Sequence, residues 1–186
     1  MKQLSLFDDR PSQNRTESLQ MDADALARWK ERIGNHQRKT RQAKPPQQGT
    51  LFALPRTAWE TPDELDPFSL RQHPADFYRH PPIDTDCNGC IYFVIDRLSE
   101  IILYIGETKL SARQRWWGEH YAKGYTMSYI ELHRKYKLDV AVCSAFWVNV
   151  PPDKKILLQW ERELIFKWRS PFNREMWEVY GQPFQK

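Results

Sequence analysis

Residues 89–106 read GCIYFVIDRLSEIILYIG, and this stretch decides the fold. Two apolar runs, at 90–96 and 101–105, flank the four residues Arg97-Leu98-Ser99-Glu100. Short runs rich in β-branched and aromatic residues, joined by a short link, are typical of an antiparallel hairpin. The stretch therefore predicts two paired strands near the start of a folded domain.

Side chains alternate between the two faces of a strand. Cys90, Tyr92 and Val94 are expected on one face of the first strand, and Ile102 and Tyr104 alternate in the same way on the second. Because side chains on one face of paired strands contact each other, the two tyrosines are expected to share a face of the sheet.

The sequence after the hairpin predicts three helices and one more strand. Helices are marked by apolar periodicity and capping residues, and the strand by apolar residues on both faces. In chain order we expect a helix over 111–123 ended by Gly124, a helix over 128–136, a strand over 139–150 and a helix over 154–169 capped by Asp153. The predicted fold is α+β, a small central antiparallel sheet in the order β-β-α-α-β-α flanked by helices.

Composition divides the 186-residue chain near residue 82. Residues 1–82 hold 9 of the 13 prolines but only 7 of the 25 aromatic residues, which favours a largely disordered, Pro-rich arm. One helix is expected in it, near 22–42, because apolar residues recur there at helical spacing. Residues 83–186 hold the other 18 aromatic residues and form the expected folded domain.

Charge and hydropathy exclude some classes of protein. The formal net charge of +4 permits nucleic-acid binding but does not by itself indicate it. The longest apolar stretch is far shorter than the roughly 20 residues of a membrane span. Charged residues near the N-terminus replace the apolar core of a signal peptide, and three cysteines build no disulfide framework. A cytoplasmic protein is expected.

Five motifs occur in a characteristic order in residues 89–173. They are Gly89-Cys90-Ile91-Tyr92, Tyr104-Ile105-Gly106, Arg115-Trp116, Glu161 and Asn173. This set resembles the GIY-YIG endonucleases, with the difference that the first glycine lies one position earlier, before Cys90. The resemblance implies a DNA endonuclease that hydrolyses phosphodiester bonds with Mg²⁺ or Mn²⁺.

The resemblance also implies a role for each residue. Tyr92 would act as general base toward the attacking water, Tyr104 would position that water, and Glu161 would bind the metal ion. Asn173 would orient its catalytic neighbours. A phenol has an ordinary pKa of about 10, so Tyr92 needs nearby positive charge to act near neutrality. The structural alternative for the two tyrosines is ordinary cross-strand packing.

Helical geometry separates Glu161 from Glu163. Leu157, Leu164, Ile165 and neighbouring apolar residues lie at helical spacing from position 161, so Glu161 is expected on the inward face. Glu163 is turned about 200° away toward water. A carboxylate facing the core requires a cation or a hydrogen-bond donor, which favours Glu161 as the metal ligand.

The phosphate-binding arginine has two candidates. Arg113 and Arg115 are two residues apart on the expected helix and point in nearly opposite directions, so one of them faces the sheet. The Arg-Trp pairing favours Arg115. His120 follows on the same helix and is a candidate phosphate contact or proton carrier. Further phosphate contacts are expected from Lys123, Lys167, Arg169 and Arg174.

A short motif near the N-terminus suggests a partner. Gln3-Leu4-Ser5-Leu6-Phe7 is similar to the pentapeptide with which bacterial repair and replication proteins bind the sliding clamp. Gln3 would reach polar groups, and Leu4, Leu6 and Phe7 would supply the apolar contacts of an extended peptide. A looser match occurs at residues 48–52.

Two alternatives compete with this interpretation. The first is a non-catalytic adaptor that binds DNA or the clamp on the same fold, although binding alone needs neither the tyrosines nor Glu161. The second is a zinc site formed by Cys87 and Cys90 with His73 and His80, which is disfavoured because no second Cys-x-x-Cys is present.

Overall fold

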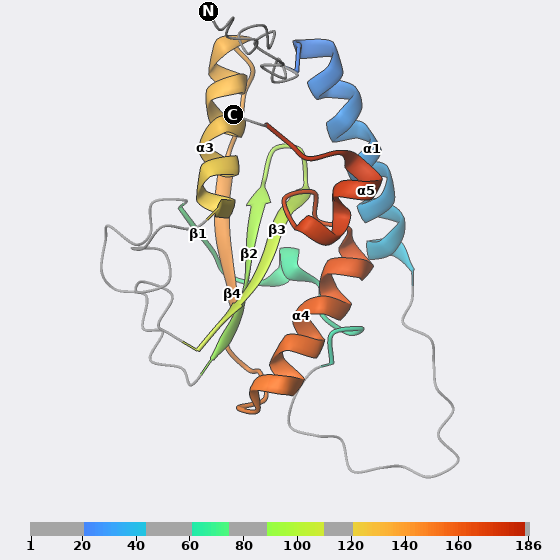
Figure 1. Cartoon of the computed structure of the whole chain (residues 1–186), viewed down its shortest axis with the longest axis vertical. Coiled ribbons are helices and arrows are strands. Elements are labelled where there is room, and N and C mark those ends of the chain that lie inside the picture. The colour runs from blue at the N-terminus through green and yellow to red at the C-terminus, as the bar shows by residue number, and fades with distance from the viewer. Residues whose placement is uncertain (1–20, 44–60, 75–88, 110–120, 185–186) are drawn as a thin grey trace, which may run out of the picture.

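The computed structural model describes residues 21–43, 61–74, 89–109 and 121–184. No helix in these ranges is both long and apolar enough to cross a membrane. The elements are α1 (Ala23–Gln42), β1 (Gln72–Pro74), β2 (Cys90–Asp96), β3 (Ile101–Thr108), α3 (Tyr121–Lys135), β4 (Val142–Trp147), α4 (Lys154–Trp168) and α5 (Trp177–Tyr180), with 3-10 turns at Pro67–Ser69 and Arg174–Met176 (Figure 1).

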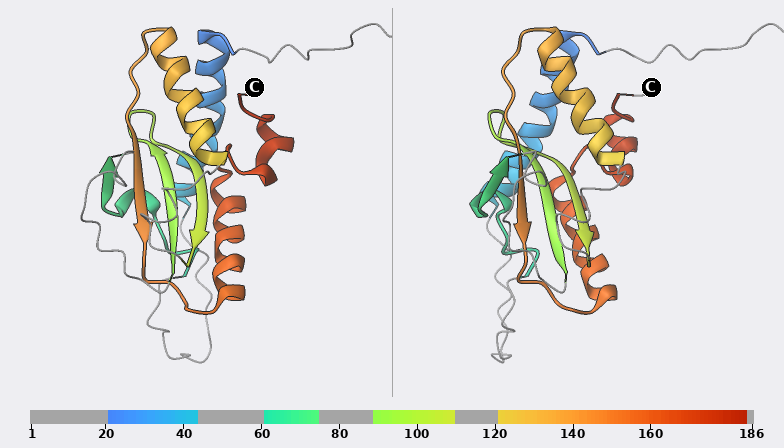
Figure 2. Two further views of the ribbon diagram at one scale, coloured as in Figure 1. Left: turned by 60° about the vertical axis from the view of Figure 1, so that its left-hand side comes forward. Right: turned by 90° about the vertical axis from the view of Figure 1, so that its left-hand side faces the viewer.

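The sheet has four strands in the order β1-β4-β2-β3, and every neighbouring pair is antiparallel. The predicted hairpin supplies β2, inside the sheet, and β3, at one edge of it. Helix α4 runs beside β3 (Figures 1 and 2). Trp160 of α4 stacks on Trp147 of β4, with ring centroids 5.1 Å apart. The α+β fold class predicted from the sequence is confirmed.

A β-bulge interrupts the hairpin. Tyr104 lies opposite Val94, but the next pair along is Ile102 with Ile95, so Leu103 has no opposite residue. Since paired residues share a face, Ile102 lies on the other face of the sheet from Tyr104. The expectation that Ile102 and Tyr104 follow one simple alternation is therefore wrong, because a bulge inserts an extra residue and reverses the alternation beyond it.

Helix α1 is part of the core. Asp22 caps it by accepting a hydrogen bond from the backbone N–H of Ala25 at 2.6 Å. Leu26 and Ile33 are fully buried, and Leu65 is buried with them. The folded unit thus includes segments that precede the boundary expected at residue 83. The average composition of residues 1–82 is polar and Pro-rich, so it does not reveal the apolar face through which α1 packs on the core.

Helix α3 continues through Gly124, where the sequence predicted a helix end. A glycine inside a helix costs only about 1 kcal/mol relative to alanine, and α3 offsets this by burying Tyr129 and His133. One helix therefore replaces the predicted stop at Gly124 and restart at 128, while residues 111–120 lie outside the described ranges. The predicted cap of α4 is confirmed, because Asp153 accepts bonds from the backbone of Lys155 and Ile156.

A buried carboxylate joins α1, the hairpin turn and α3. Asp96 is fully buried and accepts hydrogen bonds from the hydroxyls of Tyr129 and Ser99, each at 2.7 Å. Lys30 of α1 lies 3.3 Å from Asp96 and 2.9 Å from Nε2 of His133. Burial alone would raise the pKa of Asp96, but the two hydroxyl bonds and Lys30 outweigh it and lower that pKa. These contacts fasten the turn end of the hairpin, which is remote from Gly106, to α1 and α3.

Candidate active site

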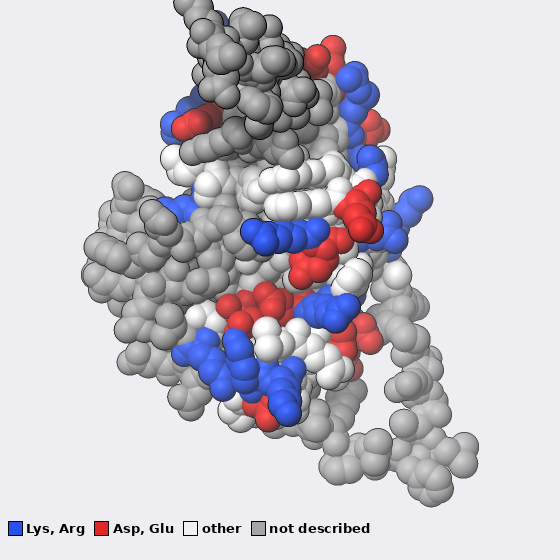
Figure 3. Space-filling model, viewed as in Figure 1, with Lys and Arg blue, Asp and Glu red and all other residues white. Residues whose placement is uncertain are grey.

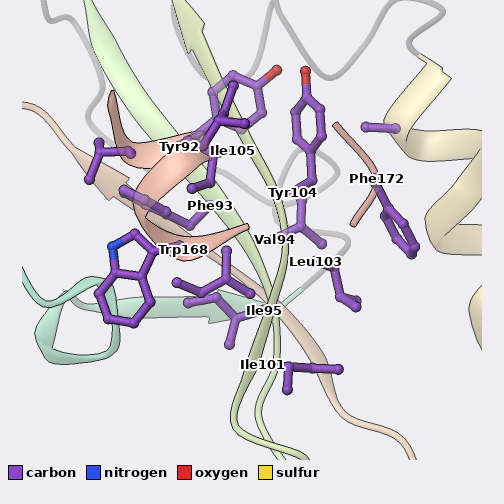
Figure 4. Packing of buried hydrophobic residues seen from close by; sticks show 14 of the residues in the cluster. Tyr92, Phe93, Val94, Ile95, Ile101, Leu103, Tyr104, Ile105, Trp168 and Phe172 are labelled. Atoms are coloured by element: carbon purple, nitrogen blue, oxygen red, sulfur yellow. The ribbon is translucent and has the colours of Figure 1, made fainter. Parts of the chain in front are cut away.

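Tyr92 and Tyr104 come together on one face of the sheet. Their ring centroids are 5.8 Å apart at an interplanar angle of 44°, and both residues are buried, at 1% and 4% exposure. Figure 4 shows the two phenol oxygens pointing in the same direction. Two hydroxyls from adjacent strands can therefore act on one small group, such as a water molecule.

Gly106 leaves the room that the two phenols need. It lies opposite Tyr92 in the hairpin. A Cβ at position 106 would stand 2.5 Å from both Oη and Cζ of Tyr92 and 2.8 Å from a ring carbon of Tyr104. Real Cβ atoms essentially never approach that closely, so any side chain at this position would displace the tyrosines.

Side chains from distant segments occupy the outer backbone edge of β3. Gln37 of α1 bonds both the N–H and the carbonyl of Ile102 and also reaches the carbonyl of Trp168. Asn173 does the same for Ile105, accepting from its N–H at 3.0 Å and donating to its carbonyl at 2.8 Å. These bonds replace a fifth strand and hold β3 in place. Asn173 therefore fixes the backbone between Tyr104 and Gly106.

Glu161, on α4, bonds to the same backbone edge of β3. Its Oε1 accepts a hydrogen bond from the backbone N–H of Glu107 at 3.1 Å, one residue beyond Gly106. Burial and, next, the charge of Glu107 raise the pKa of Glu161 to about 7. Glu163, by contrast, is exposed and accepts a bond from Gln159 one turn earlier. The predicted orientation of the two glutamates is confirmed, and the role of Glu161 as metal ligand stays a prediction.

Glu107 belongs to this group, although no motif in the sequence marks it as a site residue. Its Oε1 forms an ion pair with Lys154 at the start of α4. Its Oε2 is buried and has no hydrogen-bond partner among the described residues. The strand was expected to end at residue 105, whereas β3 continues to Thr108 and so carries Glu107 into the sheet.

Among the described residues, the carboxylates of Glu107 and Glu161 and the ammonium of Lys154 leave an excess of negative charge where little water reaches. Such an excess is unfavourable unless a cation neutralises it, and carboxylate oxygens are the ligands that Mg²⁺ and Mn²⁺ prefer. Glu161 and Glu107 therefore fit a divalent cation. Within the described ranges, no cluster of three or more His, Cys, Asp or Glu side chains is arranged to hold a metal.

Several predicted site residues lie outside the described ranges. These are Arg113, Arg115 and His120, the peptides at 3–7 and 48–52, and His80 and Cys87. Their roles stay predictions.

Lys167, one of the expected phosphate contacts, is bonded within the protein. The ammonium of Lys167 donates to the backbone carbonyls of Pro62 and Asp63 at 3.0 and 2.8 Å, so it fastens residues 61–64 to α4. Lysine and arginine side chains instead gather over the N-terminal end of α4, which Lys154 and Lys155 begin, with acidic side chains beside them (Figure 3). This basic end lies on the same helix as Glu161.

The comparisons with known proteins agree with the geometry. A family model described as the GIY-YIG catalytic domain matches residues 88–178, which include both tyrosines, Gly106, Glu161 and Asn173. Searches of curated proteins and of solved structures found no match. Helix α1 and β1 lie outside the matched segment. Through residues 88–178 the chain belongs to the GIY-YIG family, whose catalytic domains are nucleases.

Proposed function

We propose that this protein is a metal-dependent DNA endonuclease that hydrolyses phosphodiester bonds in the cytoplasm. One observation carries the proposal. The paired phenols of Tyr92 and Tyr104 pack over Gly106, and the next backbone N–H is bonded by the carboxylate of Glu161. The proposed proton acceptor, on β2, and the proposed cation ligand, on α4, thereby contact neighbouring residues of β3, Gly106 and Glu107.

Glu161 would hold the metal ion, Mg²⁺ or Mn²⁺, with Glu107 beside it. When bound, such an ion supplies positive charge that stabilises the negative charge developing on the phosphate oxygens. The surplus of buried carboxylate charge at the β3 edge supports this assignment.

Tyr92 and Tyr104 act on the attacking water in this proposal. The water oxygen forms a bond to phosphorus while its proton passes to Oη of Tyr92, which must start as the phenolate. The bond from phosphorus to the leaving oxygen breaks, and that oxygen takes a proton from solvent. Tyr104 orients the water, and Asn173 keeps Tyr104 in place through the backbone of Ile105. Arg115, with Arg113 as the alternative, would bind the scissile phosphate, and His120 would contact it or carry a proton.

A cleavage assay tests the proposal. Supercoiled and branched DNA are incubated with Mg²⁺ or Mn²⁺ and the native chain, Tyr92→Phe or Glu161→Ala. We expect cleavage by the native chain and a loss of about 10²-fold or more in each variant, the usual scale for a positioned proton-transfer group. Absence of cleavage by the native chain on every substrate, or equal cleavage by all three proteins, would support the non-catalytic adaptor instead.

We also propose that the N-terminal peptide tethers the nuclease to the ring-shaped sliding clamp of replication. Gln3, Leu4, Leu6 and Phe7 supply the polar and apolar contacts, and two attachment points would strengthen the tether if residues 48–52 also bind. A pull-down of purified clamp by the native chain checks this. We expect Leu6→Ala with Phe7→Ala to abolish capture and leave DNA cleavage unchanged, and undiminished capture would contradict the tether.

A further inference from the structure

Glu107 and Lys154 form a charged pair next to the proposed metal ligand. The backbone N–H of Glu107 bonds to Oε1 of Glu161 at 3.1 Å, and the side-chain Oε1 of Glu107 pairs with the ammonium of Lys154. The Glu107 side chain is only 14% exposed, while that of Lys154 is 44% exposed. The carboxylate of Glu107 is therefore largely shielded from water, whereas the ammonium of Lys154 is open to solvent.

The second oxygen of Glu107 is the unexplained atom of this pair. Oε2 is buried without a hydrogen-bond partner in the described part of the chain. A buried carboxylate oxygen normally accepts at least one bond, because losing its hydration is otherwise uncompensated. Among the described residues, the half-exposed Lys154 opposes the carboxylates of Glu107, Glu161 and Glu175, which leaves negative potential at any cation held by Glu161.

We propose that Glu107 and Lys154 set the cation affinity of Glu161 with opposite signs. This inference rests on the proposed function, because it takes Glu161 as the metal ligand. Glu107 is a positioning residue, which orients Glu161 through its backbone N–H and strengthens cation binding through its charge. Lys154 weakens the same binding by neutralising part of that charge.

The alternative is an ordinary structural ion pair that ties the end of β3 to the start of α4. Both hypotheses predict that removing either partner changes stability. Only the electrostatic role predicts that the two substitutions move metal affinity in opposite directions. The sign of each shift therefore separates the two explanations.

A titration with Mn²⁺ tests the inference without measuring activity. Electron paramagnetic resonance of free Mn²⁺ gives the dissociation constant for the full-length native chain and for Glu107→Gln, Lys154→Met, Glu161→Gln and Glu163→Gln. Glu163→Gln is the matched control, because it removes an exposed carboxylate from the same helix as Glu161.

We expect Glu107→Gln to weaken Mn²⁺ binding roughly tenfold, as the loss of one nearby charge at intermediate dielectric implies. Lys154→Met should tighten binding by several-fold on the same argument. The double variant should lie near the native value, and Glu163→Gln should match the native chain. In cleavage assays, Glu107→Gln should require more Mg²⁺ to reach half of its maximal rate.

The outcomes distinguish this inference from the proposed function. Native-like Mn²⁺ binding by Glu161→Gln would overturn the metal site itself and this inference with it. Loss of binding in Glu161→Gln together with unchanged binding in Glu107→Gln, or weaker binding in both Glu107→Gln and Lys154→Met, would overturn this inference alone. If Glu107→Gln fails to fold, tighter binding by Lys154→Met supports the proposal and unchanged or weaker binding overturns it.

Discussion

Gly106→Ala is expected to reduce DNA cleavage by about 10²-fold or more, because displacing reacting groups by about 1 Å has effects of this size. The new methyl group would stand 2.5 Å from Oη of Tyr92 and 2.8 Å from the ring of Tyr104. Both rings are buried, so neither can move without disturbing its neighbours. Overpacking of this kind also lowers the free energy of unfolding by about 1–3 kcal/mol. Cleavage rates and thermal unfolding measure the two effects.

Gly124→Ala is the matched control for this substitution. Gly124 lies inside α3, and a Cβ there would meet no atom within 4 Å. Alanine in a helix interior is favoured over glycine by about 0.5–1 kcal/mol. We expect Gly124→Ala to unfold at a slightly higher temperature and to cleave DNA at the native rate. Native cleavage by Gly106→Ala would show that the phenols do not need their present positions.

Glu161→Gln is expected to abolish metal-dependent cleavage and yet to stabilise the metal-free protein at alkaline pH. Burial and the charge of Glu107 raise the pKa of Glu161 from its ordinary 4.5 to about 7. The carboxyl of the folded protein thus retains its proton more readily than that of the unfolded chain. Its contribution to stability is fully present below about pH 4.5 and is lost as the pH rises through about 7.

The difference between the two pKa values corresponds to up to about 3 kcal/mol at pH 8, since one pKa unit is worth about 1.4 kcal/mol. A neutral glutamine avoids this loss. Denaturant unfolding without metal at pH 5 and pH 8 measures it. We expect the native chain to lose more stability than Glu161→Gln between these pH values, and added Mg²⁺ to restore stability only to the native chain.

Glu163→Gln serves as the control for charge removal on α4. Glu163 is exposed and bonds only to the neighbouring Gln159 in the described structure, so its replacement should change stability and cleavage little. Equal stability changes in Glu161→Gln and Glu163→Gln would contradict an unfavourable buried charge at position 161.

Local pattern was sufficient for the elements that carry the site. The alternating runs around Arg97–Glu100 predicted the hairpin, Asp153 predicted the start of α4, and helical spacing separated Glu161 from Glu163. These features depend on backbone periodicity and on hydrogen bonds between near neighbours in the chain. Such interactions form within a few residues, so the amino-acid order expresses them directly.

Contacts between distant segments decided the rest. The sequence by itself determined the hairpin, the inward face of α4 and the order of the motifs. Only the tertiary structure decided that α1 docks and bonds the edge of β3 through Gln37, that a bulge reverses the alternation after Tyr104, and that Glu107 lies beside Glu161 with Lys154 opposite. Helix docking, strand register and charge pairing depend on interaction free energies between segments that lie far apart in the chain. A local sequence pattern does not contain this information.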